Sequence, residues 1–183
     1  MRSKPTNSST RNRRTQNPLP GQISYIDAVG LSTRKTRGEA AEAAFLAKAA
    51  SFGFGIAKPW GDSERYDFIL DSGERIWRVQ VKSTESHKRT GYALSVMASN
   101  RGYNSEEIDF VVCYLVPEQM WYVIPVEVLG ERKGVYLYGK SRGGLYEQYR
   151  EAWCQMACRR KSKDLNLVNV ERRCQQGRPC PRK

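Results

Sequence analysis

Residues 75–82, RIWRVQVK, constrain the fold of this chain more than any other segment. Apolar and polar side chains alternate along them, which is the period of a β-strand with two different faces. The two faces are formed by Trp77, Val79 and Val81 and by Arg78, Gln80 and Lys82, respectively. The apolar row requires a packed layer above it. We therefore expect this strand to lie inside a sheet, with a row of polar side chains on its other face.

The segments around this strand predict an α/β fold. Thr36 and Glu39 have the spacing of a capping box, and an Ala-rich helix is expected from there to about Phe52. Strands are expected at 56–60, 66–70, 75–82, 92–97, 108–116, 120–124 and 135–138, with a helical turn at 126–129. Apolar residues then recur at helical spacing over 145–161, which predicts a C-terminal helix. This order favours a central mixed β-sheet flanked by helices.

Positive charge is concentrated at the two ends of the chain, which has a net charge of +12. Residues 1–37 contain eight Lys or Arg and one acid, and residues 151–183 contain nine and three, whereas residues 38–150 contain fourteen and fifteen. We predict a folded domain over 21–160 between a disordered basic tail, 1–20, and a basic Cys-containing tail, 161–183. Such arms favour nucleic acid as the partner. The alternative is that the tails only maintain solubility.

Several classes of protein are excluded by what the sequence lacks. No run approaches 18 apolar residues, and no apolar segment follows the basic N-terminus, so we expect neither a membrane span nor a secretion signal. We predict a cytoplasmic protein with reduced cysteines. The single histidine, His87, excludes His-rich metal sites and an HNH-type nuclease.

Acid, amide and amine side chains on neighbouring predicted elements suit the chemistry of a divalent metal ion. Asp67 begins an apolar strand, and Glu42 lies on the helix face that is expected to pack on the sheet, where a carboxylate is costly. Asp67 and the side-chain oxygen of Gln80 would supply hard oxygen ligands, and the Val81 carbonyl a third. Lys82 could orient or deprotonate a water for attack on a phosphodiester. Glu42 could bind the same ion through water, or a second ion.

Each of these residues also has a structural explanation. Glu39 is explained as the capping partner of Thr36, so we assign Glu42 to the site instead. Asp67 could be a surface acid near a turn, and Gln80 and Lys82 could form the solvated face of an edge strand. The helix–strand–strand order around all four residues favours the site.

The motifs as a group resemble the PD-(D/E)XK nuclease superfamily. Gly38–Glu42, Lys58–Asp62, Tyr66–Leu70 and Val79–Ser83 carry the resemblance, and the whole of it spans about residues 36–155. It is strongest to the branch in which glutamine replaces the second acid, a branch that includes a homing endonuclease of a cyanobacterial group I intron. The resemblance implies a restriction-endonuclease-like fold and a DNA-cleaving site that uses Mg²⁺ or Mn²⁺.

The catalytic residues implied by this resemblance are Glu42, Asp67, Gln80 and Lys82, and the metal ligands are Asp67, Gln80, the Val81 carbonyl and Glu42. Compared with the wider superfamily, Gln80 removes one formal negative charge, which should weaken metal binding. The implied partner is double-stranded DNA. Because a symmetric duplex has two scissile bonds, a homo-oligomer is expected, either a dimer or the tetramer that the related homing enzyme suggests.

Two weaker patterns complete the sequence evidence. Cys154, Cys158, Cys174 and Cys180 invite a structural zinc site, but their spacings are looser than those of a zinc knuckle and argue against it. Tyr92, Tyr103, Arg101 and Asn104 fall in or near a loop, where they could contact DNA or simply face solvent.

The sequence predicts a metal-dependent DNA endonuclease, of a homing or mobile-element type. Two alternatives remain open. The same fold could serve a branched-DNA or repair nuclease, or a DNA-binding protein that has lost cleavage. Retention of both Asp67 and Lys82 argues against the last of these.

Overall fold

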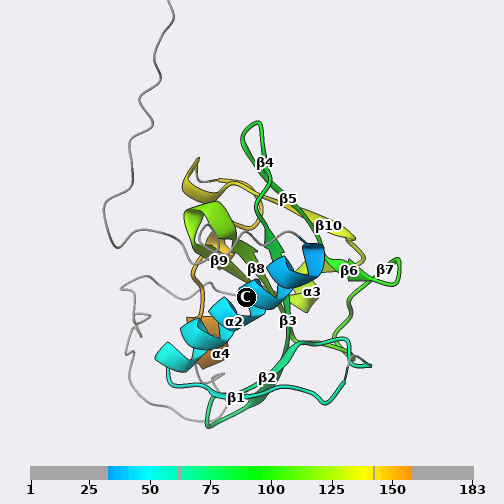
Figure 1. Ribbon diagram of the computed structural model, residues 1–183, viewed down its shortest axis with the longest axis vertical. Coiled ribbons are helices and arrows are strands. Elements are labelled where there is room, and N and C mark those ends of the chain that lie inside the picture. Colours follow the sequence, from blue (N-terminus) through cyan, green and yellow to red (C-terminus); the bar gives the residue numbers. More distant parts are fainter. Residues whose placement is uncertain (1–32, 62, 142, 158–183) are drawn as a thin grey trace, which may run out of the picture. The chain divides into compact units, whose positions relative to one another are not determined.

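The computed structural model describes residues 33–61, 63–141 and 143–157, which belong to one compact unit. This unit is built on a five-stranded sheet with the order β1-β2-β3-β8-β9. Its strands are β1 (Gly55–Ala57), β2 (Phe68–Asp71), β3 (Ile76–Thr84), β8 (Phe110–Leu115) and β9 (Met120–Pro125). The central strand, β3, runs antiparallel to β2 and parallel to β8, which confirms the mixed sheet (Figure 1).

The remaining elements are short apart from one helix. A second sheet has the order β10-β5-β4, and β6 and β7 form a ribbon. These strands are β4 (His87–Lys88), β5 (Gly91–Ser95), β6 (Met97–Ala98), β7 (Arg101–Gly102) and β10 (Gly134–Leu137). The helices are α2 (Arg34–Ser51), α3 (Val126–Leu129) and α4 (Cys154–Ala157), with 3₁₀ turns η1 (Val116–Glu118), η2 (Gly139–Ser141) and η3 (Glu147–Tyr149). No helix in the described part of the chain is long and apolar enough to cross a membrane.

Helix α2 begins earlier than the sequence predicts. Thr33 is its N-cap, and the Thr36 backbone N–H donates to the Thr33 Oγ1 at 3.2 Å while the Thr33 N–H donates to the Thr36 Oγ1 at 3.3 Å. The predicted capping box between Thr36 and Glu39 is therefore wrong, because a second threonine completes the box one turn earlier. Glu39 instead lies 4.0 Å from Lys35 in an exposed ion pair.

The central sheet separates two hydrophobic cores. Alternate residues of β8 divide between them: Val112 packs with the core under α2, whereas Val111 and Cys113 pack on the opposite face. Ala41, Phe45 and Ala49 of α2 are buried against the first core, together with Trp77, Val79 and Val81 of β3, as their alternation predicts. Leu46, which we expected on the same buried face, is 46% exposed.

The chain after β10 forms no single C-terminal helix. The prediction of a helix over 145–161 is wrong throughout the described residues, where only η3 and the four residues of α4 are helical. Arg150 forms an isolated β-bridge with Tyr122, and the backbone N–H of Glu151 donates to the Trp121 carbonyl at 2.8 Å. The segment thus touches β9 at a single β-bridge between two short helical turns, η3 and α4. Residues 158–161 lie outside the described residues.

The helical spacing in this segment has a different cause. Tyr149 packs in the core on one face of the sheet, whereas Trp153 and Met156 pack in the core on the other. The chain therefore passes around the edge strand β9 and supplies apolar side chains to both faces. A periodic sequence pattern cannot distinguish this path from one amphipathic helix.

Candidate active site

The candidate site lies where β2 stops pairing with β3. Their ladder ends at the Phe68–Val79 pair, and the backbone N–H of Asp67 donates to the Val79 carbonyl at 2.9 Å. Beyond this point β3 continues to Thr84 with only β8 beside it. The Asp67 carboxylate takes the place of the missing strand, because its Oδ2 accepts the Val81 N–H at 2.7 Å. Past the end of β2, the edge of β3 is therefore unpaired with another described strand and faces the Asp67 carboxylate.

A cleft of about 600 Å³ occupies this opening. It brings together every residue that the sequence assigned to the site, namely Glu42, Asp67, Gln80, Val81 and Lys82. Glu42 comes from α2 and the others from β3 and the segment before β2. Because the ladder ends here, a side chain from the helix above the sheet reaches the same space as side chains from the strands. Their roles in catalysis stay a prediction.

Gln80 is directly joined to Asp67. Its Nε2 donates to the Asp67 Oδ2 at 2.5 Å, and it is the one polar or charged residue that is buried within the described part of the chain, at 8% exposure. Since the Val81 N–H faces Asp67, the Val81 carbonyl lies on the same open side of β3. That carbonyl accepts only a long hydrogen bond of 3.3 Å, from Gln80 Nε2.

Burial is the main influence on the acidity of Asp67. It raises the pKa of this carboxyl above its ordinary value of 3.8, and the nearby Glu42 carboxylate raises it further. Hydrogen bonds from Val81 and Gln80 and the charge of Lys82 lower the pKa in part. The ionised carboxylate thus lacks sufficient positive charge around it, which is the condition that a bound cation relieves.

Two ion pairs lie at the helix side of the cleft. Lys58 Nζ lies 2.7 Å from Glu42 Oε2, so a lysine ammonium neutralises this carboxylate. Arg37 of α2 pairs with Glu85, beyond the end of β3, at 3.8 Å. Arg37, Glu85 and Glu42 line the cleft, whereas Lys58 reaches Glu42 from the segment after β1. Both pairs are partly exposed, so each contributes little to stability.

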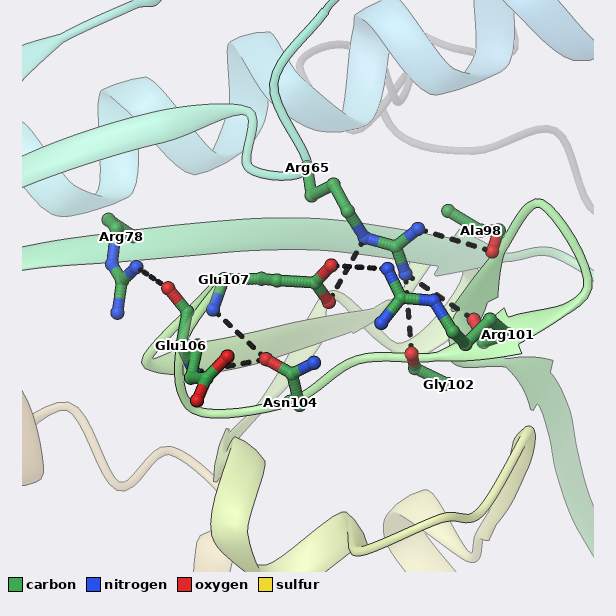
Figure 2. A network of polar contacts seen from close by, with 8 residues as sticks. All are labelled: Arg65, Arg78, Ala98, Arg101, Gly102, Asn104, Glu106 and Glu107. Atoms are coloured by element: carbon green, nitrogen blue, oxygen red, sulfur yellow. Dashed lines mark hydrogen bonds and ion pairs between the residues drawn. The ribbon is translucent and has the colours of Figure 1, made fainter.

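Lys82 rests on a support that the sequence reasoning missed. Its Nζ lies 5.6 Å from the centre of the Tyr103 ring, and the Arg65 guanidinium lies 5.1 Å from the same ring. Arg65 also pairs with Glu107 at 3.2 Å and donates to the carbonyls of Ala98, Arg101 and Gly102 (Figure 2). No sequence motif marks Arg65, because its partners are assembled from a distant loop.

Tyr92 and Tyr103 do not face solvent. Each is only 3% exposed, so the hypothesis that these two rings contact DNA is wrong. Arg101 pairs with Glu107 at 2.5 Å, and Asn104 Oδ1 accepts backbone N–H groups of its own loop (Figure 2). Of the four cysteines considered as zinc ligands, Cys154 is buried, and the other three lie outside the described residues. Within the described residues no cluster of three or more His, Cys, Asp or Glu side chains could hold a metal ion.

Comparison with known proteins places these residues in a family. The sequence model of the PD-(D/E)XK endonuclease family matches residues 32–153. No curated protein matches the sequence. Among solved structures, the bacterial homing endonuclease I-Ssp6803I is similar, with 30% sequence identity and a TM-score of 0.60 over 68% of this chain and 91% of that chain.

A more distant likeness is to Hjc, a Holliday junction resolvase from the archaeal hyperthermophile Archaeoglobus fulgidus. It has 18% sequence identity and a TM-score of 0.39 over 57% of this chain and 86% of that chain. This likeness is too low to carry an argument about function. The sheet with its covering helix is the restriction-endonuclease-like fold that the sequence predicts.

Proposed function

This chain belongs to the PD-(D/E)XK endonuclease family and is a nuclease, and we propose that it hydrolyses phosphodiester bonds of double-stranded DNA with the help of Mg²⁺ or Mn²⁺. The observation that carries the proposal is the convergence of Glu42, Asp67, Gln80 and Lys82 on one cleft at the end of β2. The similarity to I-Ssp6803I favours a homing type of endonuclease.

The donor set of the cleft fits a hard divalent cation. The carboxylates of Asp67 and Glu42, the Gln80 side-chain oxygen and the Val81 carbonyl would hold the ion. The raised pKa of Asp67 supports this assignment, because the buried carboxylate is incompletely neutralised by its neighbours. When bound, the ion would stabilise the negative charge that develops on the phosphate and acidify the attacking water.

The protein's own groups have separate tasks in this proposal. Lys82 donates a hydrogen bond to the attacking water or to a phosphate oxygen and thereby orients it. The Tyr103 ring holds the Lys82 ammonium in position. The Asp67 carboxylate keeps the Val81 backbone in place by accepting a hydrogen bond from the Val81 N–H. Gln80 has a donor and an acceptor, and its donor end lies on Asp67, which leaves the acceptor end for a cation.

Cleavage of supercoiled plasmid tests the proposal. We expect nicking in Mg²⁺ and none in EDTA, and a loss of about 10³-fold or more in Asp67→Ala and Lys82→Ala. Asp71→Asn is the matched control, because Asp71 lies at the other end of β2, is exposed and only accepts the Gly73 N–H at 2.7 Å, which asparagine can also do. Undiminished nicking by both site variants would exclude this site.

Substrate and binding assays separate the alternatives. A branched-DNA nuclease would cut a four-way junction in preference to a linear duplex of the same sequence. A protein that only binds DNA would retard duplexes without cutting them, with an affinity that falls steeply as salt rises. We propose that the active form is a dimer or a tetramer, because two strands must be cut, and light scattering of the full-length protein with its duplex measures this directly.

A further inference from the structure

We infer that the β4–β5 hairpin reads base sequence in the major groove of DNA beside the bond that is cut; this inference rests on the proposed function as a DNA endonuclease. The hairpin is continuous with the cleft. The cleft that contains Lys82 is also lined by Ser83, Thr84, Glu85 and Ser86. It therefore follows the chain from the catalytic strand directly to His87, where the hairpin begins.

The hairpin has the form that a DNA groove accommodates. β4 and β5 belong to the three-stranded sheet β10-β5-β4, and the β10 ladder ends at the Leu137–Tyr92 pair. Beyond it the hairpin is two-stranded: Lys88 pairs with Gly91, and Arg89 and Thr90 form the turn. Figure 1 shows the ribbon extending from β3 beyond the neighbouring elements. The major groove of B-DNA is about 12 Å wide and admits a two-stranded β-ribbon.

The hairpin is held rigidly by contacts to both of its strands. The Tyr136 hydroxyl donates to the Lys88 carbonyl at 2.7 Å, and the rings of His87 and Tyr92 pack edge to face at 4.8 Å. Gly91 lies so close to β10 that a Cβ would be 2.4 Å from the Leu137 carbonyl oxygen. The ribbon is thus fixed in direction before DNA arrives, which reduces the entropy that is lost on binding.

The tip carries positive side chains that the fold does not use. Residues 85–90 are all exposed, whereas Gly91 and Tyr92 are buried. Among the described residues, the side chains of Lys88 and Arg89 make no ion pair or hydrogen bond, unlike Arg65, Arg78 and Arg150. Exposed cations at the end of a rigid ribbon are the groups that reach base edges, with arginine and lysine best suited to guanine.

The length of the ribbon sets the range of its contacts. Lys88 follows Lys82 by six residue steps, and a strand rises about 3.3 Å per residue, so the Lys88 backbone lies at most about 20 Å from that of Lys82. With about 3.4 Å per base step, this corresponds to no more than about six base pairs. Base preferences that depend on the hairpin should therefore fall within about six base pairs of the cut.

The test uses the full-length protein and a duplex library with randomised sites. Products cut in Mg²⁺ and duplexes retained in EDTA are both sequenced for the wild type, the Lys88→Ala/Arg89→Ala double variant and an Arg75→Ala control. Arg75 carries the same charge but lies in the turn before β3, at the other end of that strand. We expect the double variant to lose about tenfold or more in preference at one or more base pairs within the range, and the control to keep all preferences.

Two results would overturn the inference. One is a double variant with the base preferences of the wild type. The other is a uniform loss of affinity for all sequences together with a weaker salt dependence, which is the signature of phosphate contacts alone. If the wild-type protein binds selected duplexes in EDTA but cuts none in Mg²⁺, the proposed function is contradicted. The base preferences of the bound duplexes still test the hairpin in that case. A wild type that retains no duplex overturns both.

Discussion

Arg78 and Lys82 lie on the same face of β3, four residues apart, but their surroundings differ completely. The Arg78 guanidinium is fully engaged: it pairs with Asp109 at 3.2 Å and donates to the Ser105 carbonyl at 3.0 Å. It also donates to the Glu106 carbonyl (Figure 2). The Asp109 carboxylate also accepts the Arg78 backbone N–H. Lys82 instead lines an open cleft and has an aromatic ring beneath it.

The difference follows from where each residue meets its neighbouring strands. At Arg78, β2 pairs on one side, and on the other the chain entering β8 supplies Asp109. At Lys82, β2 has ended and only β8 remains. One polar row therefore contains an end that holds the fold together and an end that is available to a substrate.

Removal of each cation should affect a different property. We expect Lys82→Ala to lower the cleavage rate by about 10³-fold, or about 4 kcal/mol of transition-state stabilisation, with a nearly unchanged melting temperature. Arg78→Ala should cost about 2 kcal/mol of folding free energy, because it leaves Asp109 half-buried without its partner, and should keep the rate per folded molecule. Urea unfolding and single-turnover cleavage measure the two. Loss of cleavage in a fully folded Arg78→Ala protein would contradict the division.

A second carboxylate beside Asp67 should make the stability of the folded protein depend on bound metal. In Gln80→Glu the new carboxylate replaces an N–H donor 2.5 Å from Asp67 Oδ2, so two like charges share one site. We expect a loss of about 1–2 kcal/mol of stability in EDTA and a larger rise in melting temperature on adding Mg²⁺ than in the wild type.

Gln155→Glu is the matched control for this variant. Its amide donates to the Val123 carbonyl at 3.1 Å, away from the cleft, so the same substitution should lower stability without any response to metal. An equal metal response in both variants would show that Gln80 does not face the ion.

The smallest effect concerns pH. Burial raises the folded-state pKa of Asp67 above its ordinary value of 3.8. The free energy of unfolding therefore decreases as pH rises from about 3.8 through the raised pKa, because ionisation is less favourable in the folded state than in the unfolded state. Asp67→Asn cannot ionise and can still accept both hydrogen bonds at its remaining oxygen. Without metal, we expect this variant to melt higher than the wild type at pH 7, and the difference to disappear as pH falls to about 3.8. A lower melting temperature at pH 7 is the opposite outcome, and thermal melts across this pH range decide between them.

Much of the fold was predictable from local patterns. The alternation in β3, the strands expected over 108–116 and 120–124 and the helical turn at α3 are confirmed. Local patterns failed where the chain responds to distant partners. The capping threonine was displaced by one turn, and the segment that passes around β9 resembled a helix because it supplies two cores in turn.

The sequence by itself determined which chemical groups are available and which face of each strand they occupy, because side-chain type and a period of two are local properties. Glu42, Asp67, Gln80 and Lys82 were assigned to the candidate site from such local patterns and from the resemblance to the PD-(D/E)XK nucleases, and their catalytic roles stay a prediction. Only the tertiary structure decided that Arg78 is committed to Asp109, that Tyr103 is buried beneath Lys82 and that a cleft opens beside Asp67. The physical reason is that a polar side chain becomes structural or available according to where the neighbouring strand ends, and that point is set by contacts between segments far apart in the chain.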